Sequence, residues 1–335
     1  MGKVNLCVLG CGSVARLHSR IARTLRSRVN LFYASRSLEK AERYNLKFNG
    51  SGAYGSYEEA CASSRIDAVF ICTPHAFHHE HVRLAAKYNK HILVEKPVAR
   101  NLDELSQIET AVGEAGVTCM VAENYYFKPL VKVLQKQLAS DNVGKPLFLE
   151  LKCAKKSRPK HWRADEELMG GGALLEGGVH WINLICNLGG EVNEVLALRP
   201  RNENPLVAPF EDTLQLLIKF SSGVVGNMLH SWNLVNRTGG LQMSKIYCAN
   251  GNIHFESNGL FVLVMGRRKR LYFPGLYDLM GYRGMLKHFL ECVQNSLQPK
   301  MSLALARRDL AVVAGAYRSL DSNRFEKIIG LESEA

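Results

Sequence analysis

Glu176, His180 and Asn183 carry the side chains best suited to acid–base chemistry in this sequence. They lie in the segment GGGALLEGGVHWIN (170–183), where Glu176 precedes His180 by four residues and Asn183 follows it by three. On an α-helix this spacing places all three on one face. A carboxylate beside an imidazole fixes its tautomer and tunes its basicity, so we expect His180 to act as a general base that Glu176 orients. A satisfied core histidine is the alternative for His180.

Lys96 is a second candidate for chemistry. It lies in the segment VEKPV (94–98), directly after an apolar run at 91–94 that is typical of a strand. Parallel sheets bind their ligands at the carboxyl ends of the strands, so we expect Lys96 in the binding crevice. Its ammonium group would stabilise negative charge that develops on a reacting oxygen. Pro97 rigidifies the backbone beside it, through a cis or a trans peptide bond. A surface cation is the alternative.

Residues 10–15 read GCGSVA, a G-x-G-x-x-A pattern between an apolar run and a helical pattern. Gly10 permits a tight turn, Gly12 lets the backbone approach a pyrophosphate, and the small Ala15 lets helix and strand pack closely. Ser13 and Val14 open a helix whose unpaired N–H groups and positive dipole end face the phosphates. In this setting the pattern predicts a dinucleotide site. A plain glycine turn is the alternative.

The segment after the second predicted strand indicates which dinucleotide binds. An NAD site usually has an acidic residue there that holds the ribose hydroxyls. This chain reads YASRS (33–37), and its first acid is Glu39. Ser35 can donate to a 2′-phosphate, and Arg36 can pair with that phosphate and cover the adenine. We therefore favour NADP(H) as the cofactor. NAD(H) is the alternative, with Arg36 as a solvated residue.

The elements that must position these residues follow two patterns. Strand-like and helical segments alternate through the first third, which favours a parallel sheet covered on both faces. The predicted strands there are 4–9, 29–34, 68–73, 91–94 and 118–122. After about residue 145 strand-like segments follow one another, separated by turn signals such as Asn250–Gly251. We predict an α/β protein with a doubly wound Rossmann domain at 1–124. A second α/β domain with a mainly antiparallel sheet, which we expect to bind the substrate, follows at 125–335.

Several motifs together resemble one family. They are GCGSVA (10–15), CTPHAFHHE (72–80), VEKPVA (94–99), AENYYF (122–127), WRADEELMGGG (162–172), GGGALLEGGVHWIN (170–183), EDTLQLLIKFSSGVVG (211–226) and ARRDLAVVAGAYRSL (306–320). Their order and spacing are similar to those of the Gfo/Idh/MocA oxidoreductases, the family of glucose–fructose oxidoreductase and inositol dehydrogenase. The resemblance covers nearly the whole chain. It implies a Rossmann domain followed by an α/β domain with an open sheet. It also implies reversible hydride transfer at a secondary alcohol carbon, usually of a sugar or cyclitol.

The resemblance also implies roles for single residues. Lys96 matches the family's active-site lysine, and His180 matches its catalytic histidine. Glu176 stands where the family usually has Asp, and Asn183 stands where a second Asp is common. The expected cofactor contacts are Gly10, Gly12, Ser13, Val14, Ala15, Ser35, Arg36, Thr73, Pro74, His75, His78, Glu95, Lys96 and Asn124. The expected substrate contacts are Lys96, Tyr125, Trp162, Arg163, His180 and Asn183.

The basic segment KKSRPKHWR (155–163) lies just before the glycine-rich segment. It suggests an anionic substrate, such as a sugar acid, a sugar phosphate or a nucleotide sugar. A solvated lid is the alternative, because charge runs are usually exposed.

The composition indicates which classes of partner to expect. The 335 residues carry a net charge of +12, which favours anionic partners. Cofactor phosphates and the substrate would pair with part of that positive charge. The run RRKR (267–270) fits a hairpin turn. We therefore expect no nucleic acid as a partner. No apolar run approaches the ~18 residues that a spanning helix needs, so we expect no membrane segment. The histidines at 75, 78, 79 and 81 match no familiar zinc spacing, so we expect no metal.

The nine cysteines form no CxxC pair, and most lie in apolar stretches. The chain does not open on a signal-peptide pattern, so we expect reduced thiols in a cytoplasmic protein. The resemblance implies a homodimer or homotetramer. Two other functions stay open within the same fold. One is an NAD-dependent glycosidase with a tightly bound cofactor, and the other is a non-catalytic regulator that senses dinucleotide and sugar.

Overall fold

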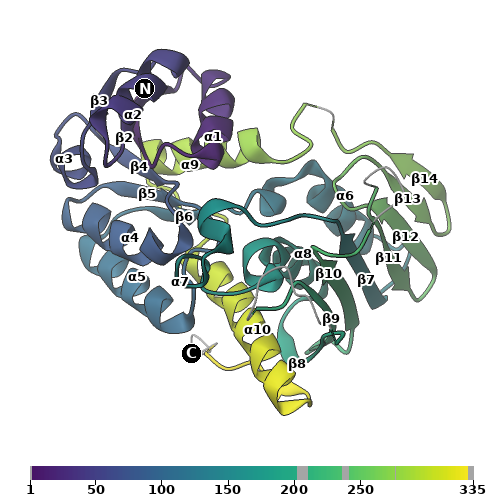
Figure 1. The fold of residues 1–335 in the computed structure, drawn as a ribbon. Helices are drawn as coiled ribbons and strands as arrows, with labels where there is room; N and C mark the ends of the chain where they lie inside the picture. Colours follow the sequence, from purple (N-terminus) through teal and green to yellow (C-terminus); the bar gives the residue numbers. More distant parts are fainter. Residues whose placement is uncertain (1, 202–209, 236–240, 276, 331–335) are drawn as a thin grey trace. The chain divides into compact units, whose positions relative to one another are not determined.

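The structure is a computed structural model of the chain that describes residues 2–201, 210–235, 241–275 and 277–330. The residues group into two compact units (Figure 1). The first unit comprises Met1–Glu123 and Tyr282–Ala306, and the second comprises Asn124–Gly281 and Arg307–Ala335. The sequence analysis placed all residues after 124 in one domain. The difference arises because helix α9 (Tyr282–Asn295) packs on α1 (Ser13–Arg23) and β1 (Val4–Leu9) of the first unit.

The described part of the first unit contains a six-stranded parallel sheet in the order β3-β2-β1-β4-β5-β6. Its strands are β1, β2 (Val29–Ala34), β3 (Gly52–Tyr54), β4 (Ala68–Ile71), β5 (His91–Val94) and β6 (Cys119–Val121). Its other helices are α2 (Leu38–Phe48), α3 (Tyr57–Ala62), α4 (His78–Lys87) and α5 (Leu102–Ala115), with the short η1 (His75–Phe77) after β4. Helix α1 contacts α2 and α9, whereas α4 contacts α3 and α5. This arrangement confirms the predicted doubly wound Rossmann fold.

The strand order of this sheet reverses at β1, which pairs with β2 on one side and β4 on the other. The crevice for a ligand in such a sheet lies outside the carboxyl ends of the strands at this switch point. The chain leaves β1 into Gly10 and leaves β4 into Cys72, so the predicted cofactor residues follow the two strands that flank it. Strand β4 is buried along its whole length, as apolar strands covered on both faces must be.

The second unit contains a nine-stranded sheet in the order β14-β13-β12-β11-β7-β10-β9-β8-β15, counted over the described residues. Its strands are β7 (Pro146–Ala154), β8 (Val192–Leu198), β9 (Thr213–Phe220), β10 (Val225–Ser231), β11 (Met243–Cys248), β12 (Gly251–Glu256), β13 (Val262–Met265), β14 (Lys269–Tyr272) and β15 (Glu326–Lys327). Strands β7 and β10 pair in parallel, and the other described pairs are antiparallel. The mixed, mainly antiparallel sheet confirms the predicted fold class.

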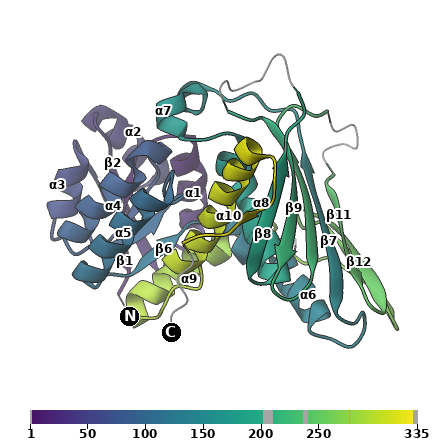
Figure 2. The same cartoon turned by 90° about the horizontal axis from the view of Figure 1, so that it is seen from below.

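Helices cover one face of this sheet. They are α6 (Pro129–Leu138), α8 (Val179–Gly189) and α10 (Leu303–Ser322), with the short elements η2 (Asn124–Phe127), η3 (His161–Ala164), α7 (Glu166–Met169) and η4 (Leu174–Gly178) around them. In Figure 2, α8 and α10 lie along one side of the strands, and no labelled helix of this unit lies on the other side. Strand β11 alternates accordingly, with Ile246 fully buried between the exposed Met243 and Tyr247. Among the described residues, none of the helices is both long and apolar enough to cross a bilayer.

Candidate functional site

The glycine loop after β1 has the geometry of a pyrophosphate cradle. Gly10 has φ +98°, and a Cβ there would lie 3.1 Å from the carbonyl oxygen of Cys72, so only glycine fits. A Cβ on Gly12 would meet nothing within 4 Å, so this residue faces open space. Gly12 is the N-cap of α1, and it makes no side-chain cap bond. The first N–H groups of α1 are therefore the natural donors for a diphosphate.

Tyr44 of α2 stabilises this loop, because its hydroxyl donates to the carbonyl oxygen of Gly12 at 2.9 Å. Ala15 is fully buried, as the predicted close packing of helix and strand requires. The sequence analysis did not identify Tyr44, because nothing in the sequence places α2 beside the glycine loop.

The carboxyl end of β2 is followed by Ser35 and the cationic Arg36. Ser35 is buried, and its hydroxyl accepts from the backbone N–H of Ser37 at 3.4 Å, which leaves its own hydrogen to donate. Arg36 is exposed. Burial raises the pKa of Tyr57 and lowers that of His81 to about 4, and the charge of Arg36 lowers both. The charge of Arg36 therefore acts on both of these side chains.

His78 joins the loops that follow β4 and β5. Its side chain is fully buried, with Nδ1 2.8 Å from the carbonyl oxygen of Pro97 and Nε2 2.9 Å from that of Thr73. Both ring nitrogens thus lie next to backbone carbonyl oxygens, and the predicted cofactor contact of His78 stays a prediction. His81, one turn later, has Nδ1 3.0 Å from the Thr73 hydroxyl oxygen. The Lys96–Pro97 peptide bond is cis.

Thr73, Pro74 and His75 follow the end of β4, where the sequence placed them. Thr73 and His75 are buried. Their predicted cofactor contacts remain predictions, as do those of Ser13 and Val14 at the start of α1. Among the described residues no group of three or more His, Cys, Asp or Glu side chains is placed to hold a metal ion.

Glu95 and His18 form a buried pair beside Lys96. His18 of α1 is 2% exposed, and its Nε2 lies 2.5 Å from Oε1 of Glu95. Burial alone would raise the pKa of Glu95, but the hydrogen bond and charge of His18, together with Lys96 and His78, bring it below its usual value. Glu95 is therefore a carboxylate next to Lys96, whose backbone N–H donates to Glu95 Oε2 at 3.2 Å. The sequence analysis missed His18.

In the second unit, the glycine-rich segment forms one π-helical turn, η4, before α8 begins at Val179. A Cβ on Gly172 would overlap the carboxylate of Glu211, and one on Gly177 would lie 3.1 Å from Nε2 of His230. The glycines therefore let this segment lie directly against His230 of β10 and against Glu211, two residues before β9. The prediction of one α-helical face for Glu176 and His180 did not include the π turn, which changes the angular spacing between them.

Glu211 anchors the start of this segment. Its Oε1 accepts from the backbone N–H of Leu174 at 2.7 Å, and its backbone carbonyl accepts from Ala173 at 2.9 Å. The hydroxyl of Tyr317 on α10 accepts from the backbone N–H of Gly172 at 3.1 Å and donates to Glu211. Burial raises the pKa of Glu211 to about 7, although these hydrogen bonds and the charge of Arg199 oppose the shift.

The predicted substrate residues named next form two groups within the second unit. The Nε of Arg163 donates to Oε1 of Glu176 at 2.9 Å, and its guanidinium carbon lies 4.4 Å from the centre of the Trp162 ring. The ring of Tyr125 stacks on that of His180, with centroids 4.5 Å apart and planes 14° apart. The aromatic and charged residues that the sequence singled out therefore lie together in these two groups.

Asn183 and Asn124 make hydrogen bonds within the second unit. Asn183 is fully buried, and its amide donates to Asp309 of α10 at 2.6 Å and accepts from Asn187 at 2.9 Å, so its side of α8 packs on α10. Asn124 is 2% exposed and donates to the carbonyl oxygen of Met280 at 2.7 Å, so its amide holds the backbone of its own unit. The predicted substrate contact of Asn183 and the predicted cofactor contact of Asn124 stay predictions.

The basic segment before α7 is exposed at Lys155, Lys156, Arg158 and Lys160. The backbone of this segment runs alongside the end of β10 and the residue after it. The N–H of Lys155 donates to the carbonyl oxygen of Ser231 at 3.0 Å, and the N–H of Ser157 donates to the carbonyl oxygen of Trp232 at 2.8 Å. The cations are thus held on ordered backbone just before Trp162 and Arg163.

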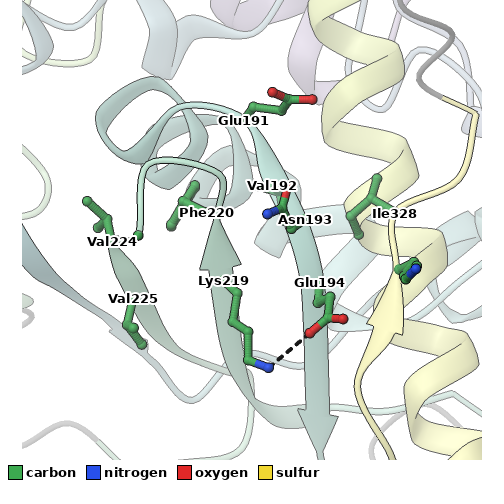
Figure 3. A pocket seen from close by; sticks show the side chains of 11 residues that line it. Glu191, Val192, Asn193, Glu194, Lys219, Phe220, Val224, Val225 and Ile328 are labelled. Atoms are coloured by element: carbon green, nitrogen blue, oxygen red, sulfur yellow. Dashed lines mark hydrogen bonds and ion pairs between the residues drawn. The ribbon is translucent and has the colours of Figure 1, made fainter.

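A separate pocket of about 700 Å³ lies where β8 and β10 begin and β9 ends, beside β15. Figure 3 shows the ion pair between Lys219 and Glu194, 2.9 Å long, on its wall. None of the predicted catalytic, cofactor or substrate residues lines this pocket. Its volume alone gives no reason to assign it a ligand.

Comparison with known proteins agrees with these observations. Residues 4–123 match the model of an oxidoreductase family with an NAD-binding Rossmann fold, and residues 131–254 match the Gfo/Idh/MocA C-terminal domain. Trans-1,2-dihydrobenzene-1,2-diol dehydrogenase of Sus scrofa is 26% identical over 83% of this chain and 84% of its own length. The scyllo-inositol 2-dehydrogenase (NADP(+)) IolU of Bacillus subtilis is 32% identical over 49% of this chain and 51% of its own. A levoglucosan dehydrogenase structure with NADH has TM-score 0.88 at 20% identity, over 98% of this chain and 99% of its own.

The raised pKa of Glu211 predicts a pH-dependent stability. Between pH 4.5 and about 7 the folded protein keeps a proton that the unfolded chain has lost, so stability falls as pH rises through this window. Glu211→Gln should remove this pH-dependent loss of stability, which is roughly 3 kcal/mol over the whole window. Denaturant unfolding of both proteins from pH 4.5 to 7.5, roughly that window, measures it. Glu39→Gln, at a side chain that is 79% exposed, is the control. Equal slopes for Glu211→Gln and the wild type would contradict the assignment.

Proposed function

Because the chain belongs to the Gfo/Idh/MocA family of NAD(P)-dependent oxidoreductases, we propose that it transfers a hydride at a secondary alcohol or ketone carbon. The substrate class is a sugar, a cyclitol or a derivative of one. The observation that carries this proposal is the glycine loop, where the open face of Gly12 and the first N–H groups of α1 meet at the sheet's switch point. The nicotinamide of the bound cofactor accepts or supplies the hydride.

In this proposal His180 and Lys96 act on the substrate oxygen. During oxidation of the alcohol His180 takes the hydroxyl proton, and during reduction of the ketone it returns one. Lys96 donates a hydrogen bond to the same oxygen and stabilises its negative charge. Glu176 orients His180, and its ion pair with Arg163 supports the charged state that this role needs. Tyr125, Trp162 and Arg163 bind the rest of the substrate.

Removing either reacting side chain should stop turnover. We expect Lys96→Met and His180→Gln each to lower kcat by at least about 100-fold, because each removes an interaction made in the transition state. Cofactor-reduction absorbance under saturating substrate measures kcat, and Lys87→Met at an exposed position is the control. An enzyme that keeps its wild-type kcat without Lys96 or His180 would refute these roles.

The end of β2 supports NADP(H) as the preferred cofactor, with NAD(H) as the alternative. The hydroxyl of Ser35 and the guanidinium of Arg36 are suited to a 2′-phosphate, and Glu39 is exposed and pairs with Arg43 at 3.7 Å. The NADP(+) in the printed name of IolU is consistent with this preference.

Arg36→Ala should weaken NADP⁺ binding by about 10–100-fold and change NAD⁺ binding little, because only NADP⁺ offers a phosphate to the guanidinium. Fluorescence titration with both cofactors measures the two dissociation constants. Arg43→Ala, on the following helix α2 with a 67% exposed side chain, is the matched control. Tighter binding of NAD⁺ than NADP⁺ by the wild type would overturn the preference.

The cations at 155–163 support an anionic substrate, because they stand on ordered backbone next to Trp162 and Arg163. We expect sugar acids and sugar phosphates to have KM values about 10-fold lower than neutral sugars of the same ring, since a charge-assisted bond is worth about 1.5–3 kcal/mol. A panel of paired neutral and charged sugars, assayed in low salt, measures the ratio. Equal KM values within each pair would favour a solvated lid.

The same panel of sugars distinguishes the dehydrogenase from the glycosidase and regulator alternatives. A glycosidase would release sugar from glycosides while its bound cofactor returns to its starting state. A regulator would bind cofactor and sugar without turnover. The presence of both Lys96 and His180 favours the dehydrogenase over the regulator.

Two further features belong to this proposal. The outer face of the nine-stranded sheet exposes apolar side chains, including Phe148, Met243 and Tyr247, and we propose a homodimer or homotetramer formed through it. Sedimentation velocity measures the mass, and a monomer would contradict it.

The nine cysteines are unpaired, and burial raises the pKa of thiols such as Cys7 and Cys119, which supports a reducing cytoplasmic setting. Microscopy of a tagged chain tests the compartment, and a secreted chain would contradict it.

A further inference from the structure

Lys128 is a fully buried lysine that the proposed chemistry does not use. It stands at the N-cap of α6 with 0% of its surface exposed. Its Nζ lies 3.5 Å from the centre of the Tyr125 ring and 3.4 Å from the carbonyl oxygen of Ser257. Lysine is rarely buried completely, because the ammonium group loses its hydration. A cation kept at this depth against an aromatic face needs a physical reason.

The same Tyr125 ring stacks on His180. The two rings are nearly parallel, 14° apart, with centroids at 4.5 Å. An ammonium over the ring centre and a stacked imidazole cannot share one face of the ring without overlapping. Lys128 and His180 therefore lie on opposite faces of Tyr125, and the order through space is ammonium, phenol ring, imidazole.

Glycine and backbone contacts fix this stack. A Cβ on Gly281 would lie 2.7 Å from the backbone nitrogen of Lys128 and 2.4 Å from the carbonyl oxygen of Asn124, so the chain can pass there only as glycine. The indole of Trp181, the residue after His180, meets Tyr125 edge-on with centroids at 5.3 Å. The Tyr125 ring is thus held by three side chains, and it transmits the position of Lys128 to His180.

We propose that Lys128 is a positioning residue for His180, which through the Tyr125 ring fixes the imidazole plane and disfavours its protonated form. This inference rests on the proposed role of His180 as a base. A base must be neutral before it can take a proton, and a second cation across one aromatic ring raises the free energy of the imidazolium. The attraction between the ammonium and the ring face holds the phenol in the plane that His180 stacks on.

Other charged groups lie on the elements packed against α8 and must be considered with Lys128. The titratable side chains on these elements are Glu176 on η4, Tyr125 and Tyr126 on η2, Glu150, Lys152 and Cys153 on β7, His230 on β10, Lys132 and Lys136 on α6, and Arg307, Arg308, Asp309, Tyr317, Arg318 and Asp321 on α10. Arg308 and Asp309 pair with each other at 2.7 Å, and Glu176 pairs with Arg163. In each of these ion pairs the opposite charges partly cancel. The Nζ of Lys128 lies over the ring on which His180 stacks, 3.5 Å from the ring centre.

The test is the titration of His180 itself. Protein labelled with ¹³C at histidine Cε1 gives one ¹H–¹³C signal per histidine, and His180→Gln identifies that of His180 by its loss. We expect Lys128→Met, which keeps the length of the side chain and removes its charge, to raise the midpoint of His180 by about one pH unit. The acid limb of the kcat/KM profile should move in the same direction. Lys132→Met, at an exposed position of α6, is the matched control and should move neither.

The outcomes separate this inference from the proposed function. An unchanged His180 midpoint in Lys128→Met, with His180→Gln inactive, overturns the inference alone. An active His180→Gln enzyme overturns the proposed function, whatever the midpoint does. Should Lys128→Met not fold, Lys128→Gln is a smaller neutral replacement, and the same two midpoints decide the result.

Discussion

Close approach of backbone to its neighbours, which only glycine allows, underlies both parts of the proposed site. In the first unit, Gly10 turns with positive φ against the carbonyl oxygen of Cys72, and this turn aims the start of α1 at the switch point of the sheet. In the second, Gly172 lies against the carboxylate of Glu211, and that contact sets the start of the segment that carries Glu176 and His180. Any side chain at Gly10 or Gly172 would push a helix start away from its sheet.

Buried polar groups then fix what the glycines bring close. The ring of His78 lies between carbonyl oxygens of the loops after β4 and β5 and donates to one of them when neutral, and Glu95 accepts a hydrogen bond from His18. In the second unit Asn183 and Asp309 join α8 to α10. Each of these groups would destabilise the fold if it were left without a partner. These buried polar groups thus join the elements on which the proposed cofactor and substrate residues stand.

Much of this arrangement could be predicted from the sequence. The alternation of strands and helices gave the Rossmann sheet, the change of pattern near residue 145 gave the antiparallel sheet, and GCGSVA gave the cradle. Helical spacing located Glu176 and His180 in one short segment, although the π turn between them has no signal that spacing can reveal. Features that depend on residues close together in the sequence could therefore be predicted from residue type and position.

Long-range packing decided the rest. Periodicity puts Asn183 near the face of His180, but only the packing of α8 on α10 turns its amide toward Asp309. His18 and Lys128 looked like single polar residues because their partners, Glu95 and Tyr125, depend on how separate elements meet. The segment Tyr282–Ala306 likewise joins the first unit through contacts that no boundary in the sequence marks.

The most direct test of this account is the affinity of Gly12→Ala for the dinucleotide. A Cβ at Gly12 meets nothing within 4 Å, so the variant should unfold at the wild-type temperature when no cofactor is present. The same methyl group would occupy the space where the backbone approaches the pyrophosphate, so NADP⁺ and NAD⁺ should both bind at least about 10-fold more weakly. Wild-type affinity for both cofactors in a stable Gly12→Ala protein would contradict the central claim that this loop is the cofactor cradle.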